Sequence, residues 1–169
     1  MCERCELAKL VAGILCADPT GRRQRDLPKD SPNPKFEGLS LDAARQKAIV
    51  AEVLMSAFTN RDFSALEQYF SPDYIQHNPF IPPRRNGLRD FIAALPAGRK
   101  YEMGMAFAEG DFVIVHGRYS GGGAEPLVAA DFFRFHDGIV VEHWDVLQNE
   151  VPLNKTVAGN AMFTPTEAL

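Results

Sequence analysis

The chain has 169 residues, of which 46% are hydrophobic and 24% charged, and its net charge is -4 at pH 7. This length and composition are typical of a single globular domain with its own hydrophobic core. The acidic balance argues against nucleic acid as a partner. Apolar runs stay short of the roughly 18 residues that a membrane span needs, so we also expect no membrane partner.

The N-terminal region holds all three cysteines, Cys2, Cys5 and Cys16. An odd number of cysteines at one end cannot form a disulfide framework, which favours a reducing, cytoplasmic location. The CERC motif supplies only two of the four ligands of a structural zinc, so no metal is predicted there. Residues 18–38 are dense in proline, glycine and charge. We therefore divide the chain into a largely disordered arm and linker (1–38), a folded domain (39–155) and a C-terminal tail (156–169).

Helical periodicity comes first in the folded domain. Ser40 can cap a helix over residues 41–62, where Ala44, Ala48, Ala51, Met55 and Phe58 recur at helical spacing. A second helix is expected over residues 63–70. Residues 74–83 are too rich in proline for an interior strand and suit a rim segment. A third helix over residues 86–95 ends before Pro96.

After Gly98 the apolar period changes to two. Four strands are expected, over residues 100–108, 111–120, 127–135 and 139–148, joined by turns rich in glycine. Helices followed by an antiparallel meander indicate an α+β fold.

The last hairpin, DFFRFHDGIVVEHWDV, has two candidate registers. A two-residue loop at Asp137-Gly138 pairs Phe135 with Val140 and places Glu142 on an apolar stripe. A three-residue loop that starts at His136 pairs Asp131 with His143 and leaves Arg134 and Glu142 together on the outside. We prefer the three-residue loop because it segregates the charged pair to solvent.

The first hairpin, with Glu109-Gly110 as its loop, places His116 on an apolar face. The simplest closure of the GGGAEP loop then pairs His116 with Asp131. The sequence therefore predicts a row of His116, Asp131 and His143 across three strands. The same face is expected to hold Tyr101, Met103 and Phe133.

Ionisable groups on an apolar wall are costly unless they satisfy one another or have a function. Burial raises the pKa of a carboxyl and a neighbouring imidazolium lowers it, so Asp131 is a candidate acid/base group. Asp145, nearer the strand end, is expected to be a pocket-rim contact or an alternative proton carrier. His143 is expected to hold the carboxylate or bind substrate. His77 is expected either to overhang the pocket mouth or to bond within its turn.

Three motifs carry a family resemblance: YIQHNP, VIVHGRY and DFFRFHDGIVVEHWDVLQ. Over residues 41–152 the chain resembles the SnoaL-like polyketide cyclases of the NTF2-like superfamily. The resemblance implies a cone-shaped α+β barrel, in which a curved antiparallel sheet and N-terminal helices enclose a pocket. It also implies intramolecular aldol condensation without metal or cofactor, with Asp131 as acid/base and His116 beside it, and a homodimer.

The function expected from these observations is cofactor-independent acid/base chemistry on a small carbonyl compound, by a cyclase or a related isomerase. One alternative is a pocket that binds a small apolar ligand without catalysis. A second is a divalent-metal enzyme that uses His116, Asp131 and His143. For Asp131 itself, a purely structural role in fixing the sheet stays open.

Overall fold

The computed structural model describes residues 42–123 and 125–165. The predicted arm over residues 1–38 and the Ser40 cap lie outside the described residues. The helical segments are α2 (Ala43–Leu54), a π-helical extension η1 (Met55–Asn60), α3 (Ser64–Tyr69), α4 (Arg84–Ala94) and a short 3-10 turn η2 (Leu153–Lys155). The strands are β1 (Phe70–Gln76), β2 (Lys100–Glu109), β3 (Phe112–Ser120), β4 (Leu127–His136) and β5 (Ile139–Asn149).

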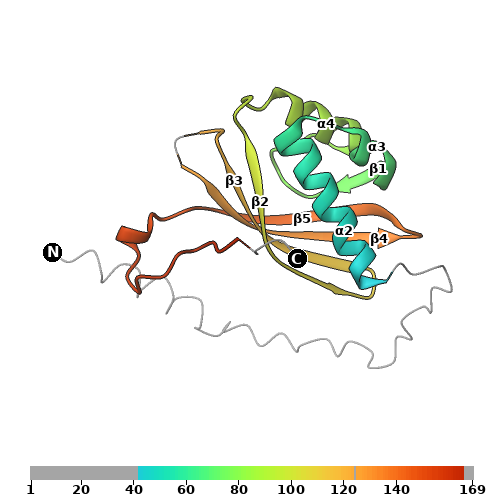
Figure 1. The fold of residues 1–169 in the computed structure, drawn as a ribbon. Helices are drawn as coiled ribbons and strands as arrows, with labels where there is room; N and C mark the ends of the chain where they lie inside the picture. Colours follow the sequence, from blue (N-terminus) through green and yellow to red (C-terminus); the bar gives the residue numbers. More distant parts are fainter. Residues whose placement is uncertain (1–41, 124, 166–169) are drawn as a thin grey trace, which may run out of the picture. The chain divides into compact units, whose positions relative to one another are not determined.

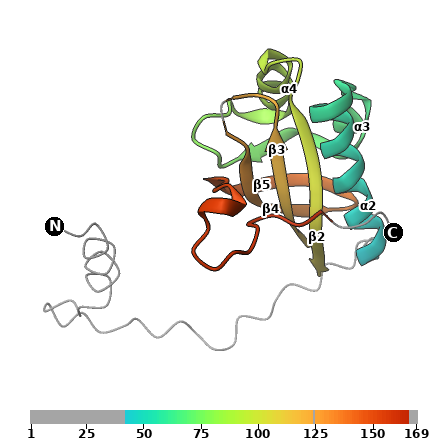
Figure 2. The same ribbon diagram turned by 60° about the vertical axis from the view of Figure 1, so that its left-hand side comes forward.

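The predicted α+β order is confirmed, and the strands form one curved, unclosed sheet in the order β1-β5-β4-β3-β2. The four C-terminal strands pair antiparallel, as expected. β1 was not predicted as a strand, and it joins the edge of the sheet parallel to β5. Helices α2 and α3 lie on one side of the strands in both views (Figures 1 and 2). The core lies between these helices and the inner face of the sheet.

Helix α2 begins at Asp42, whose side chain accepts a hydrogen bond from the Arg45 backbone N–H at 2.7 Å. The face that the sequence pattern selected is wrong in most of its members: Phe58 is buried, but Ala44, Ala48 and Met55 are exposed. Burial removes more apolar area from water for branched side chains than for alanine. The helix accordingly turns its larger side chains, Ile49, Val50, Val53 and Leu54, toward the sheet.

Two arginines, one before α4 and one in its first turn, hold this helix in place. The Arg61 guanidinium donates to the carbonyls of Ile92 and Leu95 at the C-terminal end of the helix. Arg85, in its first turn, donates to the carbonyls of Glu67 and Phe70 at 2.8 and 2.9 Å. The bonds from Arg85 fix α4 relative to α3 and β1.

The preferred register of the last hairpin is wrong, and the two-residue alternative describes its tip. Asp137 and Gly138 both have positive φ, 48° and 78°, as a type I′ turn requires. Phe135 pairs with Val140 but Arg134 pairs with Glu142, so Val141 is an extra, bulged residue. The bulge shifts the alternation of β5 by one residue. His143 and Asp145 therefore still share the inner face with Asp131, as the other register had required.

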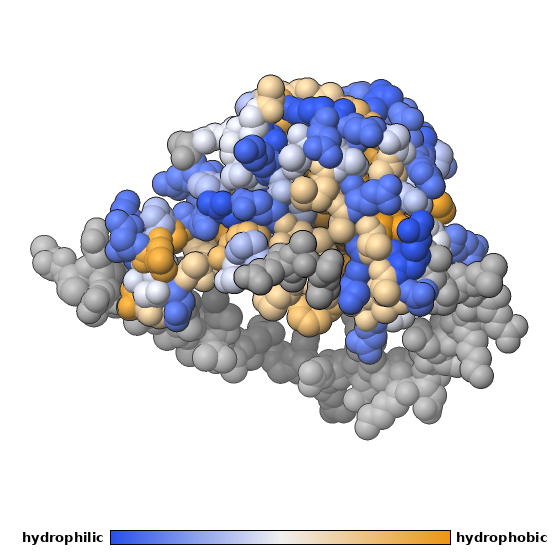
Figure 3. Space-filling model, in the orientation of Figure 1, coloured by the Kyte–Doolittle hydropathy of each residue, from blue (hydrophilic) through white to orange (hydrophobic). Residues whose placement is uncertain are grey.

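The surface of the domain mixes polar and apolar residues. Hydrophilic residues dominate the region over α4 in Figure 3, and hydrophobic residues gather along the strands below it. Exposed apolar side chains on β2 and β3 include Met105, Phe107, Phe112 and Ile114. Within residues 42–123 and 125–165, no helix combines the length and apolar character needed to cross a membrane.

Candidate functional site

A cavity lies between the helices and the inner face of the sheet. It encloses about 700 Å³ of empty space, part of it open to solvent. Most of its wall is apolar, with side chains such as Leu54, Phe58, Leu66 and Phe133. An apolar cavity with a few polar groups on its wall is typical of a small-molecule site. The polar groups on its wall are Tyr74, Asn78, Arg99, Tyr119 and His143.

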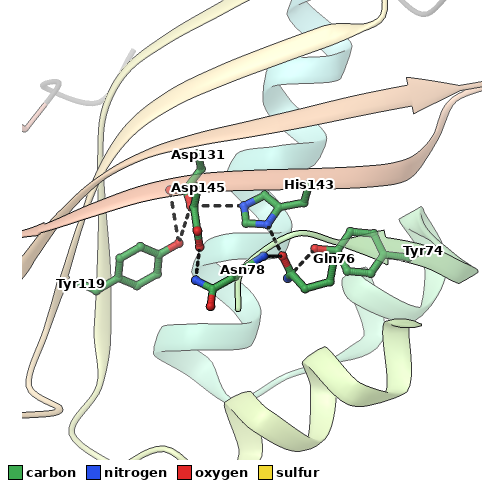
Figure 4. Close-up of polar contacts among 7 residues, drawn as sticks. All are labelled: Tyr74, Gln76, Asn78, Tyr119, Asp131, His143 and Asp145. Atoms are coloured by element: carbon green, nitrogen blue, oxygen red, sulfur yellow. Dashed lines mark hydrogen bonds and ion pairs between the residues drawn. The ribbon is translucent and has the colours of Figure 1, made fainter. Parts of the chain in front are cut away.

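Asp131 is the most deeply buried carboxylate of the site, with 1% of its surface exposed. It projects from the inner face of β4, and the Tyr119 hydroxyl donates to both of its oxygens at 3.3 Å (Figure 4). The Nε2 atom of His143 lies 3.3 Å from its Oδ1 atom. Burial raises the pKa of Asp131 above its usual value of 3.8, and His143 and Tyr119 oppose that rise without cancelling it.

The tautomer of His143 follows from its neighbours. Gln76 Oε1 accepts from the Asn78 backbone N–H at 2.9 Å, and Gln76 Nε2 donates to the Tyr74 hydroxyl at 2.9 Å. A backbone N–H can only donate, so this pair fixes the orientation of the Gln76 amide. His143 Nδ1, which is 3.1 Å from the same Oε1, must therefore carry a proton and donate it.

This assignment has a consequence for Asp131. With Nδ1 protonated, a neutral His143 presents only a lone pair at Nε2. The contact between Nε2 and Asp131 then needs a proton, either on the carboxyl or on the imidazole. Asp131 and His143 therefore share one exchangeable proton, and the His143 side chain of this pair lines the cavity.

Asp145 stands opposite Asp131 on the neighbouring strand β5. Its Oδ2 accepts from Asn78 Nδ2 at 2.7 Å, and Asn78 cannot turn around because its Oδ1 accepts from the Phe80 backbone N–H at 2.9 Å. The charge of Asp145 adds to the rise in the pKa of Asp131. The two neighbouring carboxyl groups thus have different partners, a pattern that separates acid from base in many sites.

The ligand set predicted for the metal alternative is wrong in one member. Asp131, His143 and Asp145, and not His116, each offer an atom within 4.8 Å of the others. One imidazole and two carboxylates could hold a divalent cation. A cation on Nε2 of His143 would displace the proton that this atom shares with Asp131, so the two uses of the site exclude each other.

The predicted inner face is confirmed for most of its members. Phe133 and His143 line the cavity, and Asp145 lies beside Asp131. Tyr101 packs against Tyr119, with ring centroids 4.9 Å apart, and Met103 lies opposite Gly117 on the same inner face. The roles of these residues toward a substrate stay predictions.

The predicted pairing of His116 with Asp131 is wrong. The connection between β3 and β4 closes with Tyr119, and not Ser120, opposite Leu127, one residue away from the expected register. A shift of one residue moves every side chain to the other face. His116 therefore pairs with Ala130 and packs near Phe163 on the outside, with ring centroids 5.6 Å apart.

His77 also lies away from the cavity, so neither role considered for it is correct. Its ring stacks on Trp144 at 4.7 Å, and its Nε2 bonds Glu142 Oε1 at 2.8 Å. This contact is on the outer face, where Glu142 also pairs with Arg134 as predicted.

Sequence reasoning missed Tyr119, Gln76 and Asn78. Tyr119 could have been found from the alternation of Val113, Val115 and Tyr119, which points these side chains to one face once the turn is placed correctly. Gln76 and Asn78 flank His77 in the YIQHNP motif. We can identify no signal in the sequence for the parallel pairing of β1 with β5, which brings both residues to the site.

The fold and the site together define a class of protein. In this class helices cover one side of a curved sheet, and titratable side chains lie together beside an apolar cavity. Residues 51–143, more than half of the chain, match the SnoaL-like domain, and the chain belongs to this family. No curated protein sequence matches the chain significantly.

Solved structures agree on the fold. A candidate SnoaL-like polyketide cyclase from Jannaschia sp. CCS1 is 18% identical, with a TM-score of 0.54 over 62% of this chain and 86% of the other. A candidate ketosteroid isomerase from Kribbella flavida is 17% identical, with a TM-score of 0.57 over 75% and 94%. An NTF-2 like protein from Burkholderia xenovorans is 18% identical, with a TM-score of 0.56 over 64% and 87%. Identities this low establish the fold only.

Proposed function

We propose that this domain is a cofactor-independent acid/base enzyme that acts on a small carbonyl compound, by SnoaL-like aldol cyclisation or related isomerase chemistry. The observation that carries the proposal is the proton shared by Asp131 and His143 beside an apolar cavity. The pKa of Asp131 is raised, so this carboxyl can both accept and return a proton. Family membership and the neighbouring cyclase and isomerase structures support the reaction class.

In the proposed reaction Asp131 removes a proton from the carbon next to a carbonyl group. The C–H bonding pair becomes the enolate, whose negative charge lies on the carbonyl oxygen. Tyr119 is the donor to that oxygen, because burial and the nearby Asp131 charge raise its pKa well above 10 and keep its hydroxyl protonated. Its 3.3 Å contacts to Asp131 are longer than ordinary O–H···O bonds, so a substrate oxygen can replace them.

The second half of the reaction distinguishes the two chemistries. In a cyclase the enolate carbon attacks a second carbonyl of the same molecule, a C–C bond forms, and the new alkoxide takes the proton from Asp131. In an isomerase the proton returns to a different carbon. His143 holds the carboxyl in place in both cases, through the bond that Gln76 orients.

The direct test is exchange of α-protons. A panel of β-diketones and β-keto esters is incubated in D₂O with the purified protein, and deuterium uptake and cyclised products are followed by NMR and mass spectrometry. We expect catalysed exchange for at least one compound and a loss of about 10²- to 10⁴-fold with Asp131→Asn. Asp90→Asn, a surface change on α4, is the matched control and should exchange as the wild type does. Equal exchange by the Asp131 variant would refute the assignment.

The cluster of Asp131, His143 and Asp145 keeps a divalent-metal enzyme as the second candidate. Elemental analysis of the purified protein and activity after chelation separate the two. One equivalent of tightly held metal, lost in Asp145→Asn together with activity, would favour the metal enzyme over proton sharing.

A binding-only pocket would give a different outcome. Ligands would then bind equally to the wild type and to Asp131→Asn, with no exchange of any α-proton. The homodimer predicted from the sequence stays a prediction, and the exposed Met105 and Phe107 on β2 offer a place to test it. Sedimentation of the wild type against Phe107→Glu would show whether this surface associates.

A further inference from the structure

Arg99 is a charged residue on the wall of the mostly apolar cavity. Its side chain has no hydrogen bond or ion pair within the described parts of the chain, and its Nε atom is buried without a partner. Other arginines of the domain are paired: Arg118 with Glu102 and Glu150, and Arg134 with Glu142. Arg99 is half-buried, and its buried Nε atom without a partner has a cost in the empty protein that a bound anion would relieve.

The guanidinium occupies space that a glycine leaves open. A Cβ atom built on Gly122 would lie 2.7 Å from Arg99 Cζ and 2.8 Å from Nε. At the next residue, Gly123, a Cβ atom would meet nothing within 4 Å. The GGG run between β3 and β4 therefore includes one position whose missing side chain accommodates Arg99.

Arg99 lies some distance along the strands from the pair of Asp131 and His143 that shares the proton. Arg99 immediately precedes β2, whose first residues pair with Ser120 and Tyr119, and Tyr119 pairs with Leu127 at the start of β4. Asp131 is four residues further along β4, about 13 Å at the usual rise of a strand. Tyr119 spans part of this interval because its hydroxyl reaches Asp131.

We propose that Arg99 binds the carboxylate of an apolar ligand whose body fills the cavity toward Tyr119 and His143. A planar guanidinium matches a carboxylate with two parallel hydrogen bonds, and the apolar wall strengthens the pairing. This inference deepens the proposed function, on which it rests for the reacting end of the ligand. It narrows the substrate class to apolar carbonyl compounds that also carry a carboxylate.

Binding of a matched pair of probes tests the proposal without turnover. The affinities of 2-naphthoate and 2-naphthamide, which differ in charge but little in shape, are measured by calorimetry at pH 7.5. We expect the wild type to bind the carboxylate at least about tenfold more tightly than the amide. Arg99→Gln should abolish this preference, and Arg99→Lys should retain part of it. Arg89→Gln, on an exposed arginine of α4 paired with Asp90, is the control and should keep the full preference.

The glycines give an independent pair of variants. Gly122→Ala should displace the guanidinium and reduce the preference while the melting temperature changes little, because the flexible end of Arg99 yields. Gly123→Ala should leave the preference intact.

Asp131→Asn separates this inference from the proposed function. If this variant keeps the carboxylate preference although no α-proton exchange is ever found, the Arg99 site stands and the catalytic proposal fails. Equal affinities for the two probes in the wild type, no binding of either, or an unchanged preference in Arg99→Gln would each overturn the Arg99 site.

Discussion

Replacing Asp131 by asparagine should stabilise the fold while it removes the proposed activity. The carboxyl group is 1% exposed, and its three contacts, to Tyr119 and His143, are all 3.3 Å long. Hydrogen bonds of this length compensate poorly for the hydration that the carboxyl group loses on burial. The new amide fits the same partners better, since its N–H can donate to the His143 Nε2 lone pair and its oxygen can accept from Tyr119.

The magnitude follows from this comparison. Burying a poorly satisfied polar group costs about 1–3 kcal/mol, and a domain of this size melts about 4 °C higher for each kcal/mol gained. We therefore expect Asp131→Asn to raise the melting temperature by about 4–12 °C at pH 8. Because the folded pKa of Asp131 is raised, the wild type loses stability as pH increases from about 4 through that pKa. The gain should thus shrink toward zero at pH 4.

Differential scanning calorimetry of the wild type and the variant between pH 4 and pH 8 measures this difference. Asp90→Asn, which is exposed, should shift the melting temperature by less than about 2 °C at every pH. A carboxylate kept to fix the sheet would instead give a variant that is less stable at pH 8. That result, or a gain that does not depend on pH, would refute the reasoning about the buried charge.

Three further changes have clear expected outcomes. Tyr119→Phe removes a bond that lowers the pKa of Asp131, so the acid limb of the pH–rate profile should move to higher pH, with a rate loss of about tenfold or more. Tyr101→Phe should raise the free energy of unfolding by about 1 kcal/mol in urea titration, since the Tyr101 hydroxyl is buried without a partner in the described residues. Gly121→Ala should lower it by more than about 2 kcal/mol, because φ is +73° and the Cβ would lie close to the Gly98 carbonyl oxygen.

The sequence predicted the order of elements well because period-two and helical patterns are local. It predicted the register poorly because register depends on single turn residues. In the last hairpin Asp137 accepts a positive φ, which allows the two-residue turn, and the bulge at Val141 then returns His143 to the inner face. The two-residue turn and the bulge each shift the register by one residue, so together they leave the same side chains on the inner face. Between β3 and β4 a single departure from the expected register, with Tyr119 and not Ser120 opposite Leu127, had no compensation, and His116 lies on the outside.

The residues that hydrogen-bond to His143 and Asp145 could not be predicted at all. Gln76 and Asn78 reach the cluster only because β1 pairs parallel with β5, a long-range contact without a local pattern. The position of Arg99 at the cavity was not predicted either, because an arginine in a loop rich in glycine is usually exposed to solvent. Its position at the cavity depends on the packing of α4 and the GGG run.

The segment around Asn78 gives the two paired carboxyl groups different partners. Asp131 and Asp145 both face inward from paired positions. Asn78 can offer Asp145 only its N–H groups, because its oxygen already accepts from the Phe80 backbone N–H. The charge on Asp145 raises the pKa of Asp131, whose other partners among the described residues are the Tyr119 hydroxyl and His143. One backbone turn, from Gln76 to Phe80, thus sets the tautomer of the histidine and holds beside Asp131 a charge that raises its pKa.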